Sequence, residues 1–522
     1  MEAQVPIWWI SILLPFIIAL IGSLGRIDHK KLAYIIGLSL LIPGLAAMYY
    51  WTTLNPLTYV VDPIKVDLTE YGVGTFMLVL DGLSAPVLVG VSIVTALVAV
   101  YSIKYMETRI KEMEHEGDRA PSIYAYYILY VGFAVSMLGM ALSNNLVEFY
   151  VFLEISLLTS FPLILYYGYG DRKKIALLYF IWTHVAGALF LAAILAYGIR
   201  AGTFDAFTVT DAGLVYATPA AEVLGAASRT VATMFIIGLF IKMAVLGFHM
   251  WLPYAHAEAP TPVSALLSPN LIGIAGYALA RFGFPLFPDA MLQLKGYLVT
   301  LGFATIIYGA LVALRQTDFK RFLAYSSVSQ MGYLLLGIGT LTAYGIGGAM
   351  LHYLSHAIGK AVLFMVAGVF ITELHGLRDM TKMGGLARAY PLTAAAALLG
   401  FMHLVGMPPT IGMWSEILIT IGVVNAYPAG SSGQVYLLAA ALIVAFGLSA
   451  AYAFITMRKI FYGQLGEVPR KLGVKPGYEV KDAFKMVVLI MAILGVFYFV
   501  TVGPMMTPLQ EASNQLVTLL EG

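Results

Sequence analysis

The stretch FIKMAVLGFHMWLPYAHAEAPTPVSALLS, residues 240–268, places a lysine inside an apolar helix that a glycine and several prolines then interrupt. Lys242 lies about halfway along a helix expected over 230–252. A charged side chain at mid-bilayer costs at least about 2.5–3.5 kcal/mol, so it normally faces a protein interior or a wet cavity. A broken helix survives at that depth only where protein or water satisfies its freed backbone groups. The stretch therefore predicts a functional site inside a bundle of membrane helices.

The composition of the whole chain is that of a polytopic membrane protein. Of its 522 residues, 60% are hydrophobic and 11% are charged, whereas about a quarter are charged in ordinary soluble proteins. The chain has no cysteine, which excludes thiolate-ligated clusters, disulfides and cysteine nucleophiles. A net charge of +2 gives no basis for binding nucleic acid. The lack of cysteine, with few Asn and Gln, is weakly typical of a thermophile.

Apolar runs of about 20 residues recur along the chain and predict an all-α membrane protein with about fourteen transmembrane helices. We expect these helices near residues 7–24, 32–51, 78–101, 123–142, 146–167, 174–199, 230–252, 264–286, 296–314, 322–339, 343–371, 391–425, 435–457 and 486–507. The longest intervening stretches are expected to be loops, and they are 52–77, 102–122, 200–229 and 458–485. Of these, 102–122 contains acidic and basic residues that are expected to be solvated.

The basic residues predict an orientation. Of the 30 lysines and arginines, 23 fall in the loops after the expected helices 1, 3, 5, 9, 11 and 13. This bias predicts a plasma-membrane protein with its odd-numbered loops in the cytoplasm and both termini outside. No nucleotide loop, dinucleotide fingerprint or zinc spacing occurs. We therefore expect no bound cofactor, no metal and no bond-breaking chemistry in this chain.

Three titratable residues of the expected helices 5 and 7 are candidates for an ion relay. Glu154 lies eight residues into its helix, and the alternative for it is a buried glutamate that is simply protonated or is tied to a serine. A lysine taken out of water gives up its proton more easily, so Lys242 suits a relay. The alternative is a purely structural ion pair with Glu154 or another carboxylate. His249, seven residues on, would share the stripe of Lys242 about 10 Å along the axis. Glu148 faces elsewhere near the membrane edge, and we expect a structural role for it.

The expected helix 11 contains AMLHYLSHAIGKAVLF, residues 349–364, and presents three titratable groups on one face. His352, His356 and Lys360 are spaced i, i+4, i+8, which covers about 12 Å of one helix face. Two histidines at this spacing could also bind a metal, but the glutamate of an HExxH motif is missing and no third ligand is evident. The pattern favours a relay over a metal site.

The expected helix 12 is interrupted as well. Gly406, Pro408 and Pro409 break it, and Glu416 lies about two turns past the break. His403 lies just before the break, and its role is open. The two broken helices are five apart in the chain, so they should cross the membrane in opposite senses, as inverted repeats would.

Five segments together resemble the antiporter-like membrane subunits shared by respiratory complex I, membrane-bound hydrogenases and Mrp cation/proton antiporters. They are LDGLSAPVL, KMAVLGFHMWLPYAHAEAPTPVSALLS, LRQTDFKRFLAYSSVSQMGYLLLGIG, LHYLSHAIGKAVLF and GMPPTIGMWSE. The match covers about residues 78–425. The resemblance implies fourteen helices with two inverted five-helix repeats, each with one broken helix. It divides the chain into helices 1–3 (1–122), a first repeat (123–286), a second repeat (296–462) and a loop, helix 14 and tail (463–522).

The resemblance also implies roles for the candidate residues. Glu154 and Lys242 match an interacting pair, and Glu416 matches a position that is a lysine in many members and a glutamate in some. With His352, His356 and Lys360 they would line a hydrated track near mid-membrane. That track would move protons, or exchange Na⁺ for protons, with other membrane subunits as partners and a redox module elsewhere in the complex as the driver.

This chain departs from the family pattern in the expected helix 8. Family members usually carry a lysine or histidine there, but this chain has Ser268 and Gly273 at those places, with Asn270 between them. The connection from Lys242 to helix 11 would then rest on water, Asn270 and Ser268. Gly247 stands where the family often has a proline, which still permits a break.

These patterns predict a proton-translocating subunit of a complex I-related redox assembly, with a membrane-bound hydrogenase as the favoured host. Two other hypotheses stay open. One is a subunit of a stand-alone Mrp-type Na⁺/H⁺ antiporter, and the other is a structural subunit that no longer conducts ions.

Overall fold

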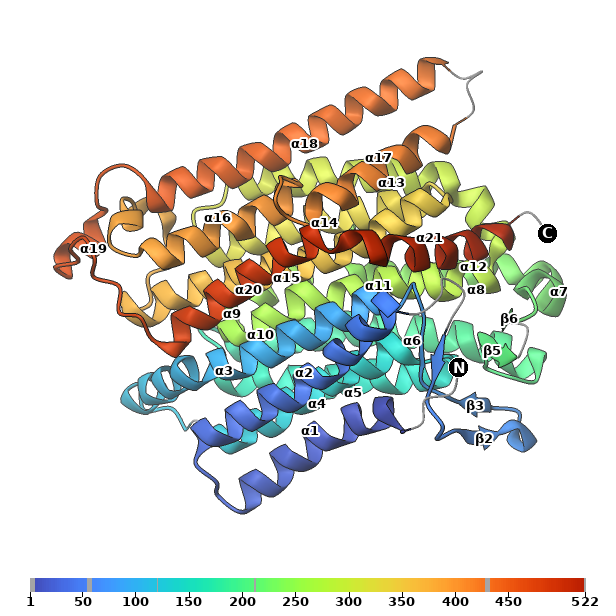
Figure 1. The fold of residues 1–522 in the computed structure, drawn as a ribbon, viewed down its shortest axis with the longest axis horizontal. Coiled ribbons are helices and arrows are strands. Elements are labelled where there is room, and N and C mark those ends of the chain that lie inside the picture. The colour runs from blue at the N-terminus through green and yellow to red at the C-terminus, as the bar shows by residue number, and fades with distance from the viewer. Residues whose placement is uncertain (1–4, 54–58, 120, 211–212, 428–431, 521–522) are drawn as a thin grey trace.

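The computed structural model describes residues 5–53, 59–119, 121–210, 213–427 and 432–520, which form one bundle of long helices (Figure 1). The helices are α1 (Ile7–Leu24), α2 (His29–Thr53), α3 (Ala85–His115), α4 (Ile123–Leu142), α5 (Leu146–Tyr167), α6 (Arg172–Ala201), α7 (Ala220–Leu224), α8 (Ser228–Met243), α9 (Trp251–Glu258), α10 (Thr261–Leu266), α11 (Ile272–Ala278), α12 (Phe284–Leu286), α13 (Pro288–Leu314), α14 (Phe319–Gly339), α15 (Ala343–Glu373), α16 (Pro391–Val405), α17 (Gly412–Asn425), α18 (Ser432–Phe461), α19 (Glu467–Lys471), α20 (Ala483–Val500) and α21 (Val502–Thr518).

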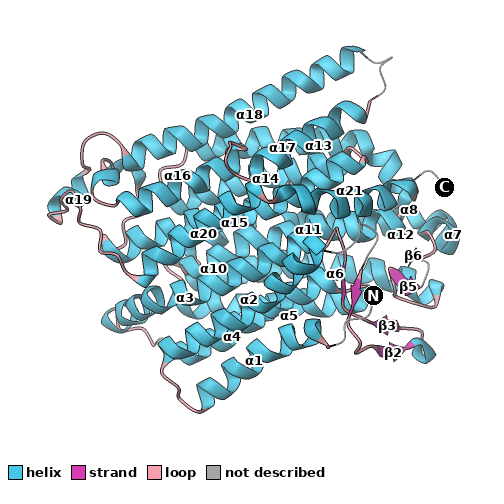
Figure 2. Cartoon of the chain, in the orientation of Figure 1, coloured by secondary structure: helices cyan, strands magenta, loops and turns pink. Residues whose placement is uncertain are grey.

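Strands are few, and Figure 2 shows them gathered at one end of the bundle. Three two-stranded antiparallel sheets pair β1 (Val60–Val61) with β4 (Val79–Leu80), β2 (Val66–Leu68) with β3 (Gly74–Phe76), and β5 (Phe207–Thr210) with β6 (Gly213–Tyr216). All of them except β4 lie in two of the stretches expected to be loops, 52–77 and 200–229. The strands cap the bundle at the end where the N-terminal label stands (Figure 1).

The chain is a mostly helical, multi-span membrane protein. Within the described residues, twelve helices are long and apolar enough to cross a membrane, and α16 and α17 are shorter apolar helices. The long helix α15 lies at the centre, because its apolar spanning segment is wholly buried. The prediction of fourteen spans in two inverted repeats stays a prediction.

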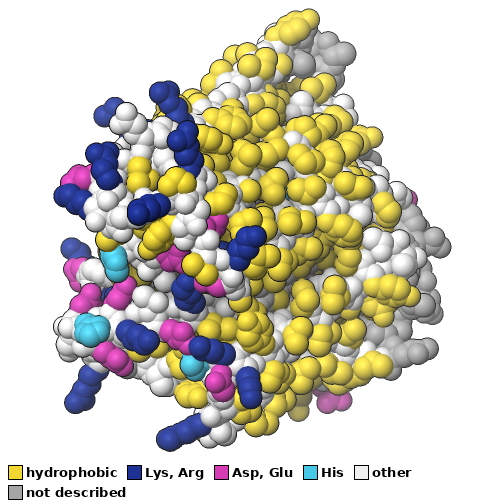
Figure 3. All heavy atoms as spheres, turned by 60° about the vertical axis from the view of Figure 1, so that its left-hand side comes forward, with side chains coloured by type: hydrophobic (Ala, Val, Ile, Leu, Met, Phe, Trp, Pro, Cys, Tyr) yellow, Lys and Arg dark blue, Asp and Glu magenta, His cyan; other side chains and the backbone are white. Residues whose placement is uncertain are grey.

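Charged side chains gather at one end of the bundle, and Figure 3 shows lysines and arginines there beside a broad hydrophobic surface. This basic end is formed by the last turns of α3, by α19 and by residues 25–28, 168–171, 315–318, 374–390 and 462–482. The start of α1 and the end of α21 lie at the opposite end (Figure 1). Basic loops and termini therefore separate as predicted, while the assignment of the basic end to the cytoplasm stays a prediction.

Two expected boundaries of the third helix were wrong. The expected helix 78–101 is replaced by strand β4 and then α3, which begins only at Ala85. Before it, Val79 and Leu80 pair with β1, and Leu78 forms an isolated β-bridge with Ser143. The charged stretch after residue 101 does not form a solvated loop but continues α3 to His115. Arg109 is buried there and donates to the Gly168 carbonyl at 2.7 Å, so the extension docks on the end of α5.

The last expected helix, 486–507, is instead two helices, α20 and α21. The backbone bends at Thr501, and α21 continues as a helix with one apolar stripe, in which Val502, Met505, Leu509 and Leu516 are buried. A stripe at this spacing packs one face of a helix on its neighbours, here chiefly on α15.

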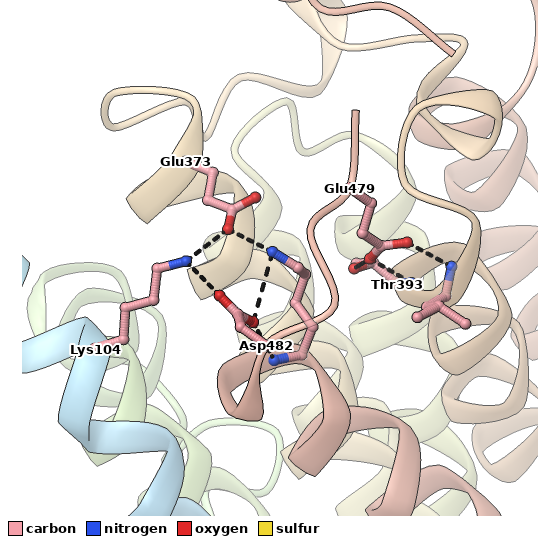
Figure 4. Close-up of polar contacts among 7 residues, drawn as sticks. Lys104, Glu373, Thr393, Glu479 and Asp482 are labelled. Atoms are coloured by element: carbon pink, nitrogen blue, oxygen red, sulfur yellow. Dashed lines mark hydrogen bonds and ion pairs between the residues drawn. The ribbon is translucent and has the colours of Figure 1, made fainter. Parts of the chain in front are cut away.

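Four charged side chains join the basic ends of three helices (Figure 4). Glu373, the last residue of α15, accepts hydrogen bonds from Lys104 of α3 at 2.8 Å and from Lys485 of α20 at 2.6 Å. Asp482 accepts from Lys104 at 2.7 Å. Lys485 is buried, so this network fixes the end of α15.

The carboxyl of Asp482 lies outside the spanning helices, at the N-cap of α20. Burial by itself would raise the pKa of Asp482, but hydrogen bonds from Lys104 and from the Lys485 backbone hold it below its usual value. A neighbouring carboxylate, Glu479, accepts from the backbone and hydroxyl of Thr393 and so caps the start of α16 (Figure 4).

Candidate functional site

Lys242 lies where the expected helix 7 is interrupted. Helix α8 ends one residue later, because Ala244 has a left-handed backbone with φ 55° and Gly247 has φ 90°. The chain resumes as α9 at Trp251, whose indole N–H donates to the Ile241 carbonyl at 2.9 Å. The amino group of Lys242 is buried and has no hydrogen-bond partner among protein atoms.

Glu154 projects from α5 toward α6. Its Oε2 lies 3.5 Å from Nδ1 of His184, a residue half exposed on α6, and its Oε1 is buried without a partner. Gly187 makes room for this carboxylate, since a side chain at that position would overlap it. Glu154 and Lys242 are close enough to interact electrostatically, but among the described residues no direct ion pair joins them. The nearest ionic partner of Glu154 is therefore His184.

His249 does not share a helical stripe with Lys242, so that expectation was wrong. The helix is interrupted over residues 244–250, and the backbone turns His249 toward α13. Its Nε2 shares a hydrogen bond of 3.1 Å with the hydroxyl of Tyr308. The helix break next to Lys242 therefore places His249 against Tyr308 of α13 and off the helical stripe of Lys242.

The three titratable groups of α15 are all buried, in the order and spacing expected from the sequence. Nδ1 of His352 shares a 3.3 Å hydrogen bond with Ser415 of α17, while neither ring nitrogen of His356 has a partner among protein atoms. The amino group of Lys360 donates to the Leu323 carbonyl at 2.9 Å. One helix therefore carries a buried column of three groups that can hold or release a proton.

Glu416 lies beside the second interruption. Helix α16 ends at Val405, Gly406 adopts φ 63°, and α17 begins at Gly412. A side chain on Gly406 would overlap the Glu416 carboxylate. Glycine therefore suits this position for two reasons, the left-handed backbone and the lack of space next to Glu416. Figure 1 shows α8 and α17 toward the end with the termini, and α9 and α16 toward the basic end, so the two broken helices run in opposite senses.

His403 lies one turn before this second break. Its Nδ1 shares a 3.0 Å hydrogen bond with the Ser355 hydroxyl, which also donates to the His403 carbonyl. Since Ser355 belongs to α15, His403 joins the end of α16 to the helix that carries the histidine column.

The expected helix 8 spans α10 to α12 and contains two π-helical segments, Leu267–Leu271 and Leu279–Gly283. Ser268 shares a 2.6 Å hydrogen bond with Ser327 of α14. Asn270 is buried with no partner for its side-chain atoms, and its carbonyl accepts from the Tyr353 hydroxyl at 3.3 Å. At Gly273 any side chain would meet the Tyr353 ring. An aromatic side chain of α15 therefore lies against the position where a lysine would stand.

The site combines buried acids and bases with few direct partners. Across the described parts of the chain, no group of three or more His, Asp or Glu residues is arranged to hold a metal ion. Buried ionisable groups without fixed partners can change protonation state in response to nearby charge. The arrangement therefore places a titratable group beside each broken helix, Lys242 at the first break and Glu416 at the second.

A family model described as "NADH:quinone oxidoreductase/Mrp antiporter, TM" matches residues 143–455, which is more than half of the chain. The chain belongs to this antiporter-like subunit family. A second model, described as "NADH-Ubiquinone oxidoreductase (complex I), chain 5 N-terminus", matches residues 74–112. The two matches cover most of the region in which the sequence motifs lie.

Relatives and solved structures agree with this family. The chain is 31% identical over 480 residues to "NAD(P)H-quinone oxidoreductase chain 4 2" of Thermosynechococcus vestitus, covering 90% of this chain and 85% of the relative. It is 31% identical to "NADH-quinone oxidoreductase subunit M" of Rhodobacter capsulatus over 408 residues, with coverage of 76% and 74%.

Two solved assemblies contain chains with the same fold. A chain of the Mrp complex from a Dietzia species matches with a TM-score of 0.81 at 22% identity over 99% of both chains. A chain of respiratory complex I from Thermus thermophilus matches with a TM-score of 0.79 at 26% identity, covering 99% of this chain and 100% of that one.

The sequence did not single out four titratable side chains of this antiporter-like subunit, of which three are buried. One is His184, which follows Thr183 in the apolar helix α6 and is half exposed. Asp81 lies in the quoted LDGLS motif, and its Oδ2 lies 2.5 Å from the buried Arg281 guanidinium. Lys320 was counted as a loop residue, yet it is fully buried. His256 lies within the quoted HAEAP motif and is also fully buried.

Proposed function

We propose that this chain is a proton-translocating subunit of a complex I-related membrane redox complex. Its relay would comprise Glu154, Lys242, His352, His356 and Lys360 together with Glu416. The observation that carries the proposal is the Lys242 amino group, which is buried at a helix break without a hydrogen-bond partner. A structural lysine in such a place would be paired, because an unpaired buried charge is costly.

Charge coupling supplies the mechanism. Protonation of Lys242 lowers the cost of negative charge on Glu154, and loss of that proton raises it. The column of His352, His356 and Lys360 then offers further acceptors. Glu416 follows Ser415, which shares a hydrogen bond with His352, and lies beside the second break. Ser268 and Asn270 would support the passage between Lys242 and this column, and His249 would contribute only through Tyr308.

The redox module and neighbouring membrane subunits would be the partners of this chain. The related chains are named as subunits of quinone oxidoreductases, which supports a host in the plasma membrane of a prokaryote. The placement of the basic end in the cytoplasm rests on the positive-inside pattern of the loops. A membrane-bound hydrogenase host, a thermophilic source and the division into two inverted repeats stay predictions.

A second candidate function is sodium–proton exchange in an Mrp-type complex. The TM-score of 0.81 to a chain of the Mrp complex favours keeping it. Gene neighbours separate the two, since a redox complex requires quinone-reductase-like or hydrogenase-like subunits nearby and an Mrp complex requires small antiporter subunits. A third candidate, a non-conducting structural subunit, rests on Gly273, where the family base is missing.

The test is ion pumping by the assembled complex in liposomes. Lys242→Ala and Glu154→Ala should abolish the pumping that depends on this subunit while the complex still assembles. Exposed Lys31, remote from the relay, provides the matched control through Lys31→Ala. Pumping at the unmodified rate in both relay variants would refute the proposed function.

A further inference from the structure

Two fully buried titratable side chains near the basic end are not used by the proposed relay. His256 lies on α9, the segment after the first helix break, and neither of its ring nitrogens has a hydrogen-bond partner among protein atoms. Its ring packs on Phe364 of α15, with centroids 5.4 Å apart. Lys320 is the second residue of α14, and its amino group donates to the Ala259 carbonyl. Buried polar groups normally have partners, so an unpartnered imidazole points to a function.

A cavity of about 620 Å³ opens at the basic end next to these residues. Its lining includes Glu258, Asp318 and Arg321. Glu258 directly precedes Ala259, which accepts the hydrogen bond from Lys320, and Glu258 and Asp318 are close enough to Lys320 to interact electrostatically. The cavity therefore brings acidic side chains from the surface of the basic end to the buried lysine.

The same residues connect inward to the column on α15. His256 interacts electrostatically with both Lys320 and Lys360, and His356 interacts with His256. Lys360 donates to the Leu323 carbonyl, three residues after Lys320 on α14. Three residues of helix rise correspond to about 4.5 Å, so the amino group of Lys360, which belongs to α15, contacts α14 about one turn from the backbone of Lys320.

We propose that Glu258, Lys320 and His256 form the proton entrance from the basic end to Lys360 and His356. A proton from water in the cavity would bind the Glu258 carboxylate and pass to the Lys320 amino group when that group is in its uncharged form. It would then pass to a ring nitrogen of His256 and on to Lys360. Each group returns to its starting state after one proton has passed, and no other reactant is consumed. This inference rests on the proposed function and names the route by which protons reach the relay.

A structural role for Lys320 is the competing explanation, because its surroundings hold it firmly. The Tyr169 ring centroid lies 5.9 Å from its amino group, and the Tyr169 hydroxyl shares a 2.8 Å hydrogen bond with Tyr105. Thr261 donates to the Tyr105 hydroxyl at 2.9 Å. A lysine that only fixed the Ala259 carbonyl in this cluster would need its charge and its hydrogen bond, but not the release of a proton.

Lys320→Arg separates these two roles. Arginine keeps the positive charge and can donate to a carbonyl, but it does not give up its proton in proteins. In the assembled complex reconstituted in liposomes, proton uptake from the side of the basic end should be lost in Lys320→Arg and in His256→Gln. The matched control is Lys295→Arg at the opposite end of the bundle, because Lys295 also donates to a helix-terminal carbonyl, that of Ala426, at 2.7 Å. It should pump at the unmodified rate.

The outcomes distinguish the entrance from the relay itself. Full uptake in both Lys320→Arg and His256→Gln, with Lys242→Ala inactive, would overturn the entrance and leave the proposed function standing. Full uptake in Lys242→Ala as well would overturn the proposed function. If Lys320→Arg fails to assemble, His256→Gln decides, because the change removes no hydrogen bond to the ring: loss of uptake supports the entrance, and full uptake overturns it.

Discussion

Gly406 offers a direct test of how the second helix break positions Glu416. Substitution by alanine introduces two separate penalties. The first is backbone strain, since φ at this position is 63° and a left-handed conformation costs a residue with a side chain about 1–2 kcal/mol. The second is overlap, because the new Cβ would coincide with the Glu416 carboxylate. Overpacking a filled site costs about 1–3 kcal/mol.

Together the two penalties predict that Gly406→Ala lowers the free energy of unfolding by about 2–5 kcal/mol. It should also reduce ion pumping, because the Glu416 carboxylate must move to make room. Thermal unfolding of the purified complex in detergent measures the first effect, and dye-detected pumping in liposomes measures the second.

Gly447 in α18 provides the matched control. It has no atom within 4 Å of an added Cβ, and its φ is not in the left-handed region. Alanine inside a helix is favoured over glycine by about 0.5–1 kcal/mol, so Gly447→Ala should be neutral or stabilising. Equal unfolding temperatures and equal pumping for the two variants would refute the assignment of Gly406 to the support of Glu416.

Three further outcomes are expected. Gly273→Lys should prevent assembly because the Tyr353 ring fills the space, and adding Tyr353→Ala should restore assembly on a native gel; assembly of the single variant would contradict this packing. Arg281→Met should leave the Asp81 carboxylate buried and unpaired and destabilise the fold by about 3–5 kcal/mol, measured by thermal unfolding, where an unchanged transition would disprove the buried pair. The depressed pKa of Asp482 means that its stabilising contribution is present above about pH 4 and is lost as the pH falls through the folded value. Thermal scans of the wild type and of Asp482→Asn from pH 7 to pH 3 should therefore differ at pH 5 and converge at the acid end.

The membrane class and both helix interruptions could be predicted, because composition and breaker residues report directly on them. Lys242 at a break is an example: a charge in an apolar run followed by glycine and prolines has few structural solutions. The column of His352, His356 and Lys360 could be predicted equally well, since helical spacing alone places the three residues on one face.

Contacts between distant segments could not be predicted from one sequence. Glu154 meets His184 and not Lys242 directly, because the rotation of α5 against α6 decides which side chain is nearer. The absence of a basic residue at Gly273 could be noted from the sequence. That the Tyr353 ring of α15 fills the space at this position can be seen only from the packing of the two helices.

Lys320 illustrates a different limit. A lysine at the start of an expected helix looks like an ordinary charge of a cytoplasmic loop, and the positive-inside pattern counts it as such. Its burial follows from the α9–α10 connection, whose Ala259 carbonyl accepts its hydrogen bond. The depth of a charge at a helix end therefore depends on which segment covers it.

The most direct test of the account is proton pumping by a complex that carries Lys242→Arg. Arginine preserves the positive charge at the first helix break but does not release its proton. The substitution therefore abolishes the role of a lysine that passes protons on, but it preserves the role of a lysine that acts only through its charge. We predict an assembled complex whose pumping through this subunit is lost, while Lys295→Arg pumps normally. Unchanged pumping in Lys242→Arg would contradict the central claim that a proton passes through Lys242.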